Sequence, residues 1–260
     1  MKKIITLFIL SILLCGIITS CKSKDEITAI RDRGELRVGI KADVPKFGYI
    51  DPATGKPEGM EVDLARLFAK DILGNENTVK FINVGSAQTR AALLENGGID
   101  IAVATFTITE ERKKTFNFSR PYFIDELGCL VRAGSGIQKI EDLNGKTAGV
   151  VRTSTAKAAF EKECTRLGIR VTLQEFPSYP EVKQALKNSK IDAFVSDKSI
   201  LFGYSDKSHV LLNHGFNPQE YGAATKKENV KLIARIDTIL DTLEKNGGLA
   251  AILKKWDLTP

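Results

Sequence analysis

The chain has 260 residues and a mass of 28.5 kDa, enough for one large domain or two of ordinary size. Apolar residues make up 43% and charged residues 27%, a composition that excludes a disordered chain or a coiled coil. The 38 basic and 32 acidic side chains give a net charge of +6. This small excess is dispersed, which argues against a nucleic-acid-binding protein because such proteins concentrate basic residues in a stripe.

The first twenty residues are typical of a secretory signal. Lys2 and Lys3 precede an apolar run over residues 4–18, in the order of a basic region and an apolar region. The following Ile18-Thr19-Ser20-Cys21 fits the bacterial lipobox, which places small residues directly before the lipidated cysteine. We therefore expect residues 1–20 to be a lipoprotein signal peptide and Cys21 to carry a diacylglycerol. The alternative is an ordinary cleaved signal in which Cys21 is incidental.

A lipid on Cys21 would hold the protein on the outer face of a bacterial membrane, in the periplasm or at the cell surface. Residues 21–27 are then expected to form a short solvated tether. Two other cysteines, Cys129 and Cys164, could form a disulfide in an oxidising compartment or remain buried free thiols. Their spacing decides neither.

Short apolar strands alternate with amphipathic helices through the first half of the mature chain. This alternation predicts an α/β fold with a mostly parallel sheet covered by helices. The expected strands span residues 36–40, 79–84 and 99–104, and the expected helices run between Gly59 and Gly74 and over residues 90–96.

The same pattern begins again in the second half, with strands over residues 147–151 and 170–174 and helices over residues 156–167 and 181–186. Two segments also match at identical spacing. They are Leu94-x-Asn96-x-x-Ile99-Asp100-x-x-Val103 and Leu186-x-Asn188-x-x-Ile191-Asp192-x-x-Val195. Each closes a helix and opens a buried strand, so the repeat indicates two lobes of similar build.

The last forty residues return to a helix with one apolar face, between Val230 and Leu243. We expect this helix to pack on the first lobe, which requires the chain to cross between lobes twice, near residues 123–126 and 221–224. The first lobe then comprises residues 27–123 and 222–260, and the second lobe comprises residues 124–221. Two lobes joined by two crossings predict a hinged clamshell.

In open α/β sheets the ligand lies beyond the carboxyl ends of the strands. Those ends are expected at residues 41–45, 105–112, 152–155 and 196–197. Arg112 is notable there because a cation in a first helical turn opposes the helix dipole. A bound anion, such as a carboxylate, would satisfy both Arg112 and the free amides. Thr109 fits a simple N-cap, and Asp197 fits either a helix cap or a site for an ammonium group.

These residues carry a family resemblance that covers residues 27–258. The chain resembles the polar amino-acid solute-binding proteins of ABC importers, solute-binding family 3, whose fold is a type II periplasmic-binding-protein clamshell. The matching motifs are Leu36-Arg37-Val38-Gly39, Gly59-x-x-Val62-Asp63-Leu64-Ala65, Thr107-Ile108-Thr109-x-x-Arg112, Phe118-Ser119-x-Pro121-Tyr122 and Ile191-Asp192-Ala193-Phe194-x-x-Asp197.

The resemblance implies that the protein binds an amino acid and passes it to ABC permease subunits, as a monomer without cofactor or metal. It implies that Arg112 binds the α-carboxylate and Asp197 the α-ammonium group. Further donors are implied at Thr105, Thr107, Ser154 and Thr155.

The residues expected at the side-chain end of the pocket favour an acidic ligand. Val44 stands where many family members have an aromatic wall, while Lys41 and Arg90 place two cations nearby. Buried cations around a neutral ligand would lack a partner. The chain resembles the aspartate- and glutamate-binding members most, and that subgroup implies that Tyr179 and Tyr221 donate from their hydroxyls. Packing at the lobe interface is the alternative for Tyr179.

One loop departs from the family. Thr153 stands where a glycine often precedes two small hydroxyl residues, so the backbone geometry of this loop is in question. Arg152, before it, fits either a ligand contact or a solvated residue at the lip of the pocket.

Three other functions compete with amino-acid binding. Periplasmic dehydratases share this resemblance, but His209 and His214 are expected at the surface, and no nucleophile-elbow, metalloprotease or phosphate-loop motif occurs. We expect a binding protein and not an enzyme. A surface adhesin or a receptor sensor is a second rival, and since no membrane segment follows Pro260 we expect no covalent sensor. The third alternative keeps the class and changes the ligand to glutamine, asparagine or cystine.

Overall fold

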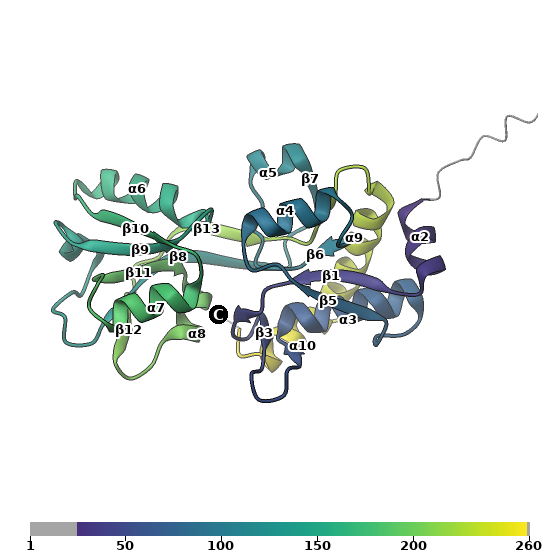
Figure 1. Cartoon of the computed structure of the whole chain (residues 1–260), viewed down its shortest axis with the longest axis horizontal. Helices are drawn as coiled ribbons and strands as arrows, with labels where there is room; N and C mark the ends of the chain where they lie inside the picture. Colours follow the sequence, from purple (N-terminus) through teal and green to yellow (C-terminus); the bar gives the residue numbers. More distant parts are fainter. Residues whose placement is uncertain (1–24, 259–260) are drawn as a thin grey trace, which may run out of the picture.

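The computed structural model describes residues 25–258. They form two lobes, each built around a β-sheet with helices on both faces (Figure 1). The α/β fold and its two lobes therefore agree with the prediction. The expected signal peptide and Cys21 lie outside the described residues. Within residues 25–258, no helix is both long and apolar enough to cross a bilayer.

The sheet of the first lobe has five strands. Strand β1 (Leu36–Ile40) pairs in parallel with the edge strand β5 (Val79–Asn83) on one side and with the central strand β6 (Ile101–Ala102) on the other. The edge beyond β6 is antiparallel and consists of β14 (Ala224–Lys226) and β7 (Phe116–Phe118). Helices α3 (Met60–Leu73) and α4 (Ala87–Glu95) pack against it, α3 on β1 and β5 and α4 on β6 and β14.

Helix α3 begins and ends at glycines, as the sequence predicts. Gly59 has a φ of 123°, and a Cβ at this position would overlap the carbonyl oxygen of Phe47. Gly74 follows the helix with a φ of 79°, and its amide bonds the carbonyl of Lys70. Both backbone conformations favour glycine because they have positive φ.

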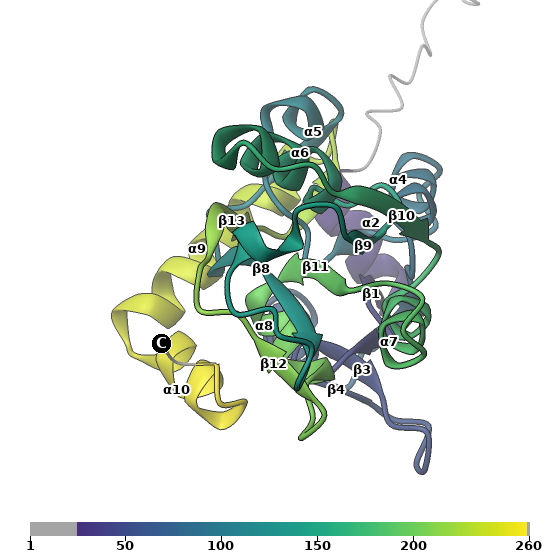
Figure 2. The ribbon, with the colours of Figure 1, turned by 90° about the vertical axis from the view of Figure 1, so that its left-hand side faces the viewer.

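The sheet of the second lobe has six strands. Strands β10 (Thr172–Phe176), β9 (Thr147–Val151) and β11 (Ala193–Asp197) are parallel. Strand β8 (Phe123–Arg132) then pairs antiparallel with β11, β12 (His209–Leu211) and β13 (Phe216–Tyr221). Helix α6 (Ala156–Leu167) covers one face, and α7 (Tyr179–Lys187) and α8 (Lys198–Tyr204) cover the other (Figure 2).

The predicted mostly parallel sheets are in fact mixed. In the second lobe, β8 runs between the lobes and can pair with β11 and β13 only in the antiparallel sense. In the first lobe, β14 follows the second crossing and pairs antiparallel with β6. The crossings thus add antiparallel strands to each parallel centre.

Several elements were not foreseen. The expected loop after β1 contains a small three-stranded sheet of β2 (Asp43–Val44), β3 (Gly48–Ile50) and β4 (Pro57–Glu58). The end of the expected tether is helical, because α2 (Glu26–Arg33) begins there and Asp25 caps it by accepting from the Thr28 amide. A 3₁₀ turn over Ile140–Leu143 and α10 (Gly248–Lys255) were also not foreseen, whereas the short helix α5 (Glu110–Thr115) follows its expected cap Thr109.

The two crossings lie side by side. Strand β8 begins at Phe123 and β13 ends at Tyr221, and these two residues are partners in the ladder. Tyr221 also forms a bridge with Thr107 of the first lobe. The chain then continues to α9 (Val230–Lys245), which packs on α2 and α3, and Arg235 of α9 pairs with Asp71 of α3.

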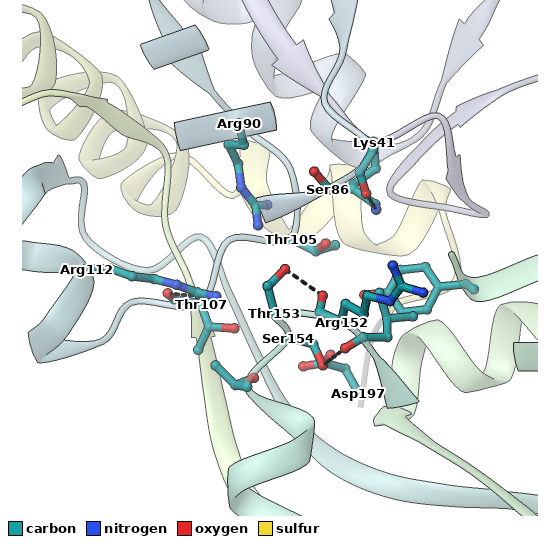
Figure 3. A pocket seen from close by; sticks show the side chains of 14 residues that line it. Lys41, Ser86, Arg90, Thr105, Thr107, Arg112, Arg152, Thr153, Ser154 and Asp197 are labelled. Carbon is teal, nitrogen blue, oxygen red and sulfur yellow. Dashed lines mark hydrogen bonds between the residues drawn. The ribbon is translucent and has the colours of Figure 1, made fainter. Parts of the chain in front are cut away.

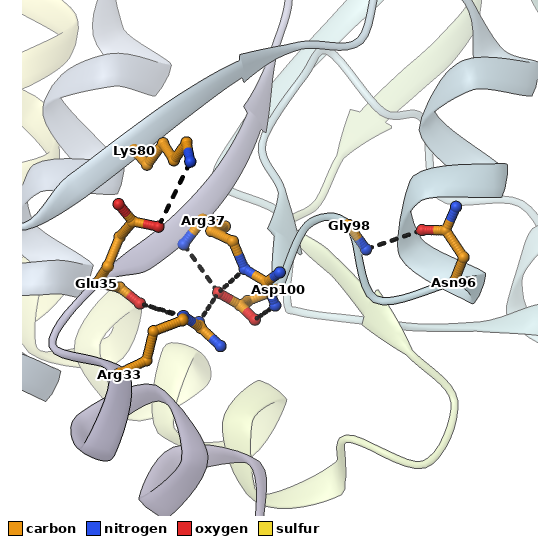
Figure 4. A network of polar contacts seen from close by, with 7 residues as sticks. All are labelled: Arg33, Glu35, Arg37, Lys80, Asn96, Gly98 and Asp100. Atoms are coloured by element: carbon orange, nitrogen blue, oxygen red, sulfur yellow. Dashed lines mark hydrogen bonds and ion pairs between the residues drawn. The ribbon is translucent and has the colours of Figure 1, made fainter.

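The internal repeat corresponds to the same local structure in both lobes. Asp100 accepts from the backbone amide of Arg37 at 2.8 Å, and its own amide donates to the Arg37 carbonyl at 2.9 Å. Asp192 does the same with Thr147, at 3.0 Å and 2.7 Å. In the first lobe Arg33 and Arg37 also contact the Asp100 carboxylate (Figure 4). Each aspartate thus joins the start of one strand to the adjacent parallel strand.

Cys129 and Cys164 are free thiols buried in the core of the second lobe. Burial raises the pKa of Cys129 far above its usual range. This arrangement matches the free-thiol alternative.

Candidate functional site

A cavity lies between the lobes, at the carboxyl ends of their parallel strands. Nine of the ten predicted ligand-binding residues line it, and seven of these nine lie at the strand ends where the sequence predicts a ligand. Figure 3 shows cationic side chains on the first-lobe side and Asp197 on the second-lobe side. The lining residues are Lys41, Gly85, Ser86, Arg90, Thr105, Thr107, Arg112, Val151, Arg152, Thr153, Ser154, Thr155, Tyr179 and Asp197.

Arg112 extends from the first turn of α5 into the cavity. Thr109 caps this helix by accepting from the Arg112 amide at 3.2 Å. The Arg112 guanidinium donates to the Thr107 carbonyl at 2.7 Å and lies 4.6 Å from the ring centroid of Phe106. Burial lowers its pKa, and nearby Asp197 partly offsets that effect. The guanidinium is therefore oriented by the protein and keeps donors for a ligand.

Asp197 ends β11 and precedes α8, but its side chain makes no capping bond to that helix. Its Oδ1 is buried without a hydrogen-bond partner in the described part of the chain. Burial, reinforced by the charge of Asp125, raises the pKa of Asp197 to about 7. A carboxylate in this state gains from a cationic partner, so the geometry favours an ammonium site over a helix cap.

Arg90 and Lys41 are both nearly fully buried, with 6% and 5% of their surface exposed. Arg90 lies 3.8 Å from the ring centroid of Phe106 and donates to the Ala104 carbonyl. Burial, with the charge of Arg112, lowers its pKa to about 10. Lys41 donates to the Gly85 carbonyl at 2.6 Å. Phe106 therefore contacts two guanidinium groups and fixes both.

Each of these two cations also has an acidic neighbour within the protein. Lys41 Nζ lies 3.2 Å from Asp43 Oδ1. Arg90 interacts electrostatically with Glu61, a fully buried residue of α3. The positive charge at this end of the cavity is thus partly balanced before any ligand binds.

Glu61 lies behind the cavity wall. Its Oε1 accepts from the Thr105 amide and the Tyr122 hydroxyl, each at 2.5 Å. Its Oε2 has no hydrogen-bond partner within residues 25–258, and burial raises the pKa of Glu61 to about 7. Thr105, held by this bond, has a φ of 43°, a conformation uncommon for a residue with a Cβ.

The second lobe contributes a loop before α6. Ser154 Oγ donates to the Val151 carbonyl at 2.7 Å, and Thr155 Oγ1 donates to Gln219 at 2.7 Å. Thr155 occupies the N-cap position without a side-chain capping bond, which leaves the amides of the first turn for another acceptor.

Thr153 adopts the left-handed backbone that this loop requires, with a φ of 59°. This explains why many family members have a glycine at this position of the loop. Glycine adopts the left-handed region without the strain that a β-branched residue has. Thr153 Oγ1 contacts Gln88 of the first lobe at 3.2 Å. Arg152 lines the cavity and is also exposed, so it lies at the lip.

The two tyrosines differ. Tyr179 lines the cavity, and its ring lies 4.9 Å from Lys41 Nζ, so it forms a wall and also packs at the lobe interface. Tyr221, which was predicted to line the pocket, is not among the residues that line this cavity. Tyr221 is fully buried at the crossing, where its ring packs on Phe47 and Phe123. Its hydroxyl donates to Asp125 at 3.5 Å, and its interaction with the Asp197 carboxylate lowers the pKa of Asp197 in part.

Sequence reasoning missed Ser86, Gly85, Asp43 and Glu61. Ser86 caps α4 by accepting from the Thr89 amide, and a cap signature before the helix of Arg90 could have identified it. Asp43 and Glu61 carry no such signal, because their partners lie on other elements. Val44, which stands where many family members have an aromatic wall, is fully buried and does not line the cavity.

Contacts between the lobes close the cavity. The Tyr204 hydroxyl of the second lobe donates to the Asp43 carbonyl of the first lobe. Lys46 Nζ lies 4.5 Å from the ring centroid of Phe202. These contacts describe a clamshell in its closed form.

One predicted surface residue is buried. The His209 side chain is 1% exposed and its Nδ1 lies 2.8 Å from Asp206 and Lys183, whereas His214 is half exposed. Strand β12 places His209 inward beside β8. Neither histidine lines the cavity.

Comparison with known proteins identifies relatives along most of the chain. The family of bacterial extracellular solute-binding proteins, family 3, matches residues 36–259. The ABC transporter glutamine-binding protein GlnH of Bacillus subtilis is 36% identical, over 98% of this chain and 97% of that protein. The glutamine-binding protein of Geobacillus stearothermophilus is 39% identical, over 76% and 75%.

A solved structure agrees with the fold. An ancestral arginine-binding protein bound to glutamine has a TM-score of 0.76 and 34% identity, over 87% of this chain and 99% of that chain.

Proposed function

Because the chain belongs to the bacterial extracellular solute-binding proteins of family 3, we propose that its ligand is glutamine, which it delivers to an ABC importer. The family comprises extracellular solute-binding proteins, and the relative from Bacillus subtilis is a glutamine-binding protein of an ABC transporter. The identity of the ligand's side chain depends on separate observations.

The observation that carries amino-acid binding is the opposition of Arg112 and Asp197. They line one cavity from different lobes, with opposite charges, and both are oriented by the protein. An α-carboxylate at Arg112 and an α-ammonium group at Asp197 would join the lobes through the ligand. Donors from Thr107 and the start of α6 lie beside the carboxylate end.

Two observations support glutamine. The relatives at 36% and 39% identity are glutamine-binding proteins. In the cavity, Lys41 is paired with Asp43 and Arg90 is balanced in part by Glu61. The argument for an acidic ligand assumed that both cations lack a partner, and these acids remove that assumption. A neutral amide can then occupy this end at little electrostatic cost.

Glutamate is the second candidate, favoured by one specific observation. Arg90 Nε is buried with no hydrogen-bond partner among the described residues. A carboxylate oxygen is a stronger acceptor for such a donor than an amide oxygen. Aspartate has the same group on a shorter side chain.

Calorimetry of the mature, unlipidated chain tests the proposal. The panel comprises glutamine, glutamate, aspartate, asparagine and cystine. We expect glutamine to bind at least tenfold more tightly than the others. Tighter binding of glutamate or aspartate would establish the second candidate, and tighter binding of cystine would reject both.

We also propose that Cys21 anchors the protein through a diacylglycerol. The support is the lipobox Ile18-Thr19-Ser20-Cys21 after an apolar run. Expression of the full chain in a bacterium with radiolabelled palmitate should label the wild type and leave Cys21→Ala unlabelled. Equal labelling, or release of wild-type protein into the soluble fraction, would reject the anchor.

A further inference from the structure

A buried acid behind the cavity, Glu61, has no role in the clamp described above. It is fully buried on α3, and its Oε1 is fixed by the Thr105 amide and the Tyr122 hydroxyl at 2.5 Å each. It is not among the residues that line the cavity. A fully buried carboxylate is costly unless its charge has a use or a partner.

The charged neighbours of Glu61 are the two cations at the side-chain end. Arg90 from α4 and Lys41 after β1 both act on Glu61 electrostatically, and Tyr122 is the other titratable group that faces it. Arg90 also interacts electrostatically with Arg112, and Lys41 pairs with Asp43 at 3.2 Å. Glu61 therefore supplies negative charge to a region in which three cations surround the ligand.

Two buried polar atoms without hydrogen-bond partners support the same conclusion. Glu61 Oε2 and Arg90 Nε are both buried without hydrogen-bond partners within the described ranges. The two side chains thus balance charge without using up each other's hydrogen-bonding capacity. Arg90 keeps a donor for a ligand, while its charge is opposed from behind the wall.

We propose that Glu61 is a specificity-determining residue, which weakens the binding of an acidic side chain relative to a neutral one by opposing the charge of Arg90. The inference rests on the proposed binding of a polar amino acid, and it holds whether glutamine or glutamate binds more tightly. What Glu61 sets is the ratio of the two affinities.

The direct test measures that ratio in Glu61→Gln by calorimetry at pH 8. The substituted glutamine side chain at position 61 keeps the shape of Glu61 and can still accept hydrogen bonds from Thr105 and Tyr122 through its amide oxygen. The negative charge of Glu61 is lost. We expect glutamate affinity to rise at least tenfold relative to glutamine affinity. Glutamine affinity itself should change less than threefold. An unchanged ratio would overturn the proposal.

A matched control uses another glutamate of the first lobe. Glu35 directly precedes β1, does not line the cavity, and pairs with Lys80 at 3.9 Å (Figure 4). Glu35→Gln removes the same charge and should leave the ratio unchanged. An equal shift in both variants would show a general effect of net charge and overturn the assignment to Glu61.

The wild-type protein provides a test that needs no variant. Because burial raises the pKa of Glu61 to about 7, the charge that opposes Arg90 should be lost between pH 8 and pH 6. Glutamate affinity should then rise relative to glutamine affinity as the pH falls, and the trend should vanish in Glu61→Gln. Asp197 titrates in the same range, but it faces the ammonium group that both ligands share, so it cancels in the ratio.

The outcomes separate the two proposals. If neither ligand binds the wild type, amino-acid binding as proposed is wrong. If both ligands bind and the ratio of their affinities is independent of pH and of Glu61→Gln, only the role of Glu61 is wrong. If Glu61→Gln does not fold, the pH dependence of the wild-type ratio decides.

Discussion

The hydroxyl of Tyr204 donates a hydrogen bond to the backbone carbonyl of Asp43, which lies in the other lobe. Asp43 also lies 3.2 Å from Lys41 in the cavity. One contact thus connects closure of the lobes with the wall of the site. The closed form depends on such contacts, because a hinge of two strands permits rotation.

Removing this hydroxyl should favour opening. We expect Tyr204→Phe to weaken every ligand by about three- to tenfold, since a hydrogen bond contributes roughly 0.5–1.5 kcal/mol. The ranking of ligands should not change, because the bond lies outside the side-chain end. Small-angle scattering with and without saturating glutamine should show a decrease in radius of gyration on binding. A radius unaffected by ligand in an initially open protein would argue against hinge closure.

The side-chain end is tested by Arg90→Leu. Arg90 supplies a charge and an unpartnered donor at this end, so its loss should weaken glutamate more than glutamine, by at least about tenfold in the ratio. The reason is that glutamate depends on the charge, whereas glutamine uses only the hydrogen bond. Equal losses of affinity for both ligands would show that Arg90 shapes the cavity but does not distinguish the two ligand side chains.

The pH dependence of binding follows from Asp197. Burial raises the pKa of its carboxyl to about 7 in the free protein, and the ligand's ammonium group favours the ionised form. Affinity for glutamine should therefore fall below pH 7, by up to about tenfold per pH unit. Calorimetry in buffers of different ionisation enthalpy should show proton release on binding near pH 6. Binding that is constant from pH 8 to pH 5 would contradict this assignment.

The same group affects the stability of the free protein. Because its pKa is higher in the folded state than the ordinary value of 3.8, the folded protein holds a proton that the unfolded chain releases between about pH 4 and pH 7. The free energy of unfolding should decrease as the pH rises through this window, and it should stay at the lower value at higher pH. Asp197→Asn should remove part of it, on the order of 2 kcal/mol. Thermal unfolding of both proteins at pH 5 and pH 8 measures the difference.

The internal repeat predicts matched effects at two glycines. A Cβ on Gly39 would lie 2.7 Å from Ile99 Cδ1, and a Cβ on Gly149 would lie 2.5 Å from Ile191 Cδ1. Each isoleucine belongs to one of the repeated segments. Substitution by alanine should destabilise by about 1–3 kcal/mol at each site, because a packed core must shift. Urea unfolding checks this, and a neutral result at either glycine would argue against close packing there.

The sequence was sufficient where local patterns decide the structure. Apolar periodicity and flanking glycines located α3 between Gly59 and Gly74. The strand ends brought Arg112 and Asp197 to one cavity, although they are 85 positions apart in the chain.

What the sequence could not provide were relationships between elements far apart in the chain. Glu61 and Asp43 look like ordinary acids of a helix and a loop until the fold places them beside Arg90 and Lys41. Tyr221 was assigned to the cavity because its motif is shared, but its neighbours Phe47 and Phe123 hold it at the crossing. The acidic ligand was expected for the same reason, since charge was counted without the buried acids.

The central claim is that one amino acid joins the lobes through Arg112 and Asp197. Calorimetric titration of glutamine into the wild type, Arg112→Ala and Asp197→Ala tests it most directly. Each substitution leaves a buried charge of the ligand unpaired, so we predict a loss on the order of 2–5 kcal/mol in binding free energy with the fold intact. Affinity close to that of the wild type in either variant, with a native circular dichroism spectrum, would contradict the account.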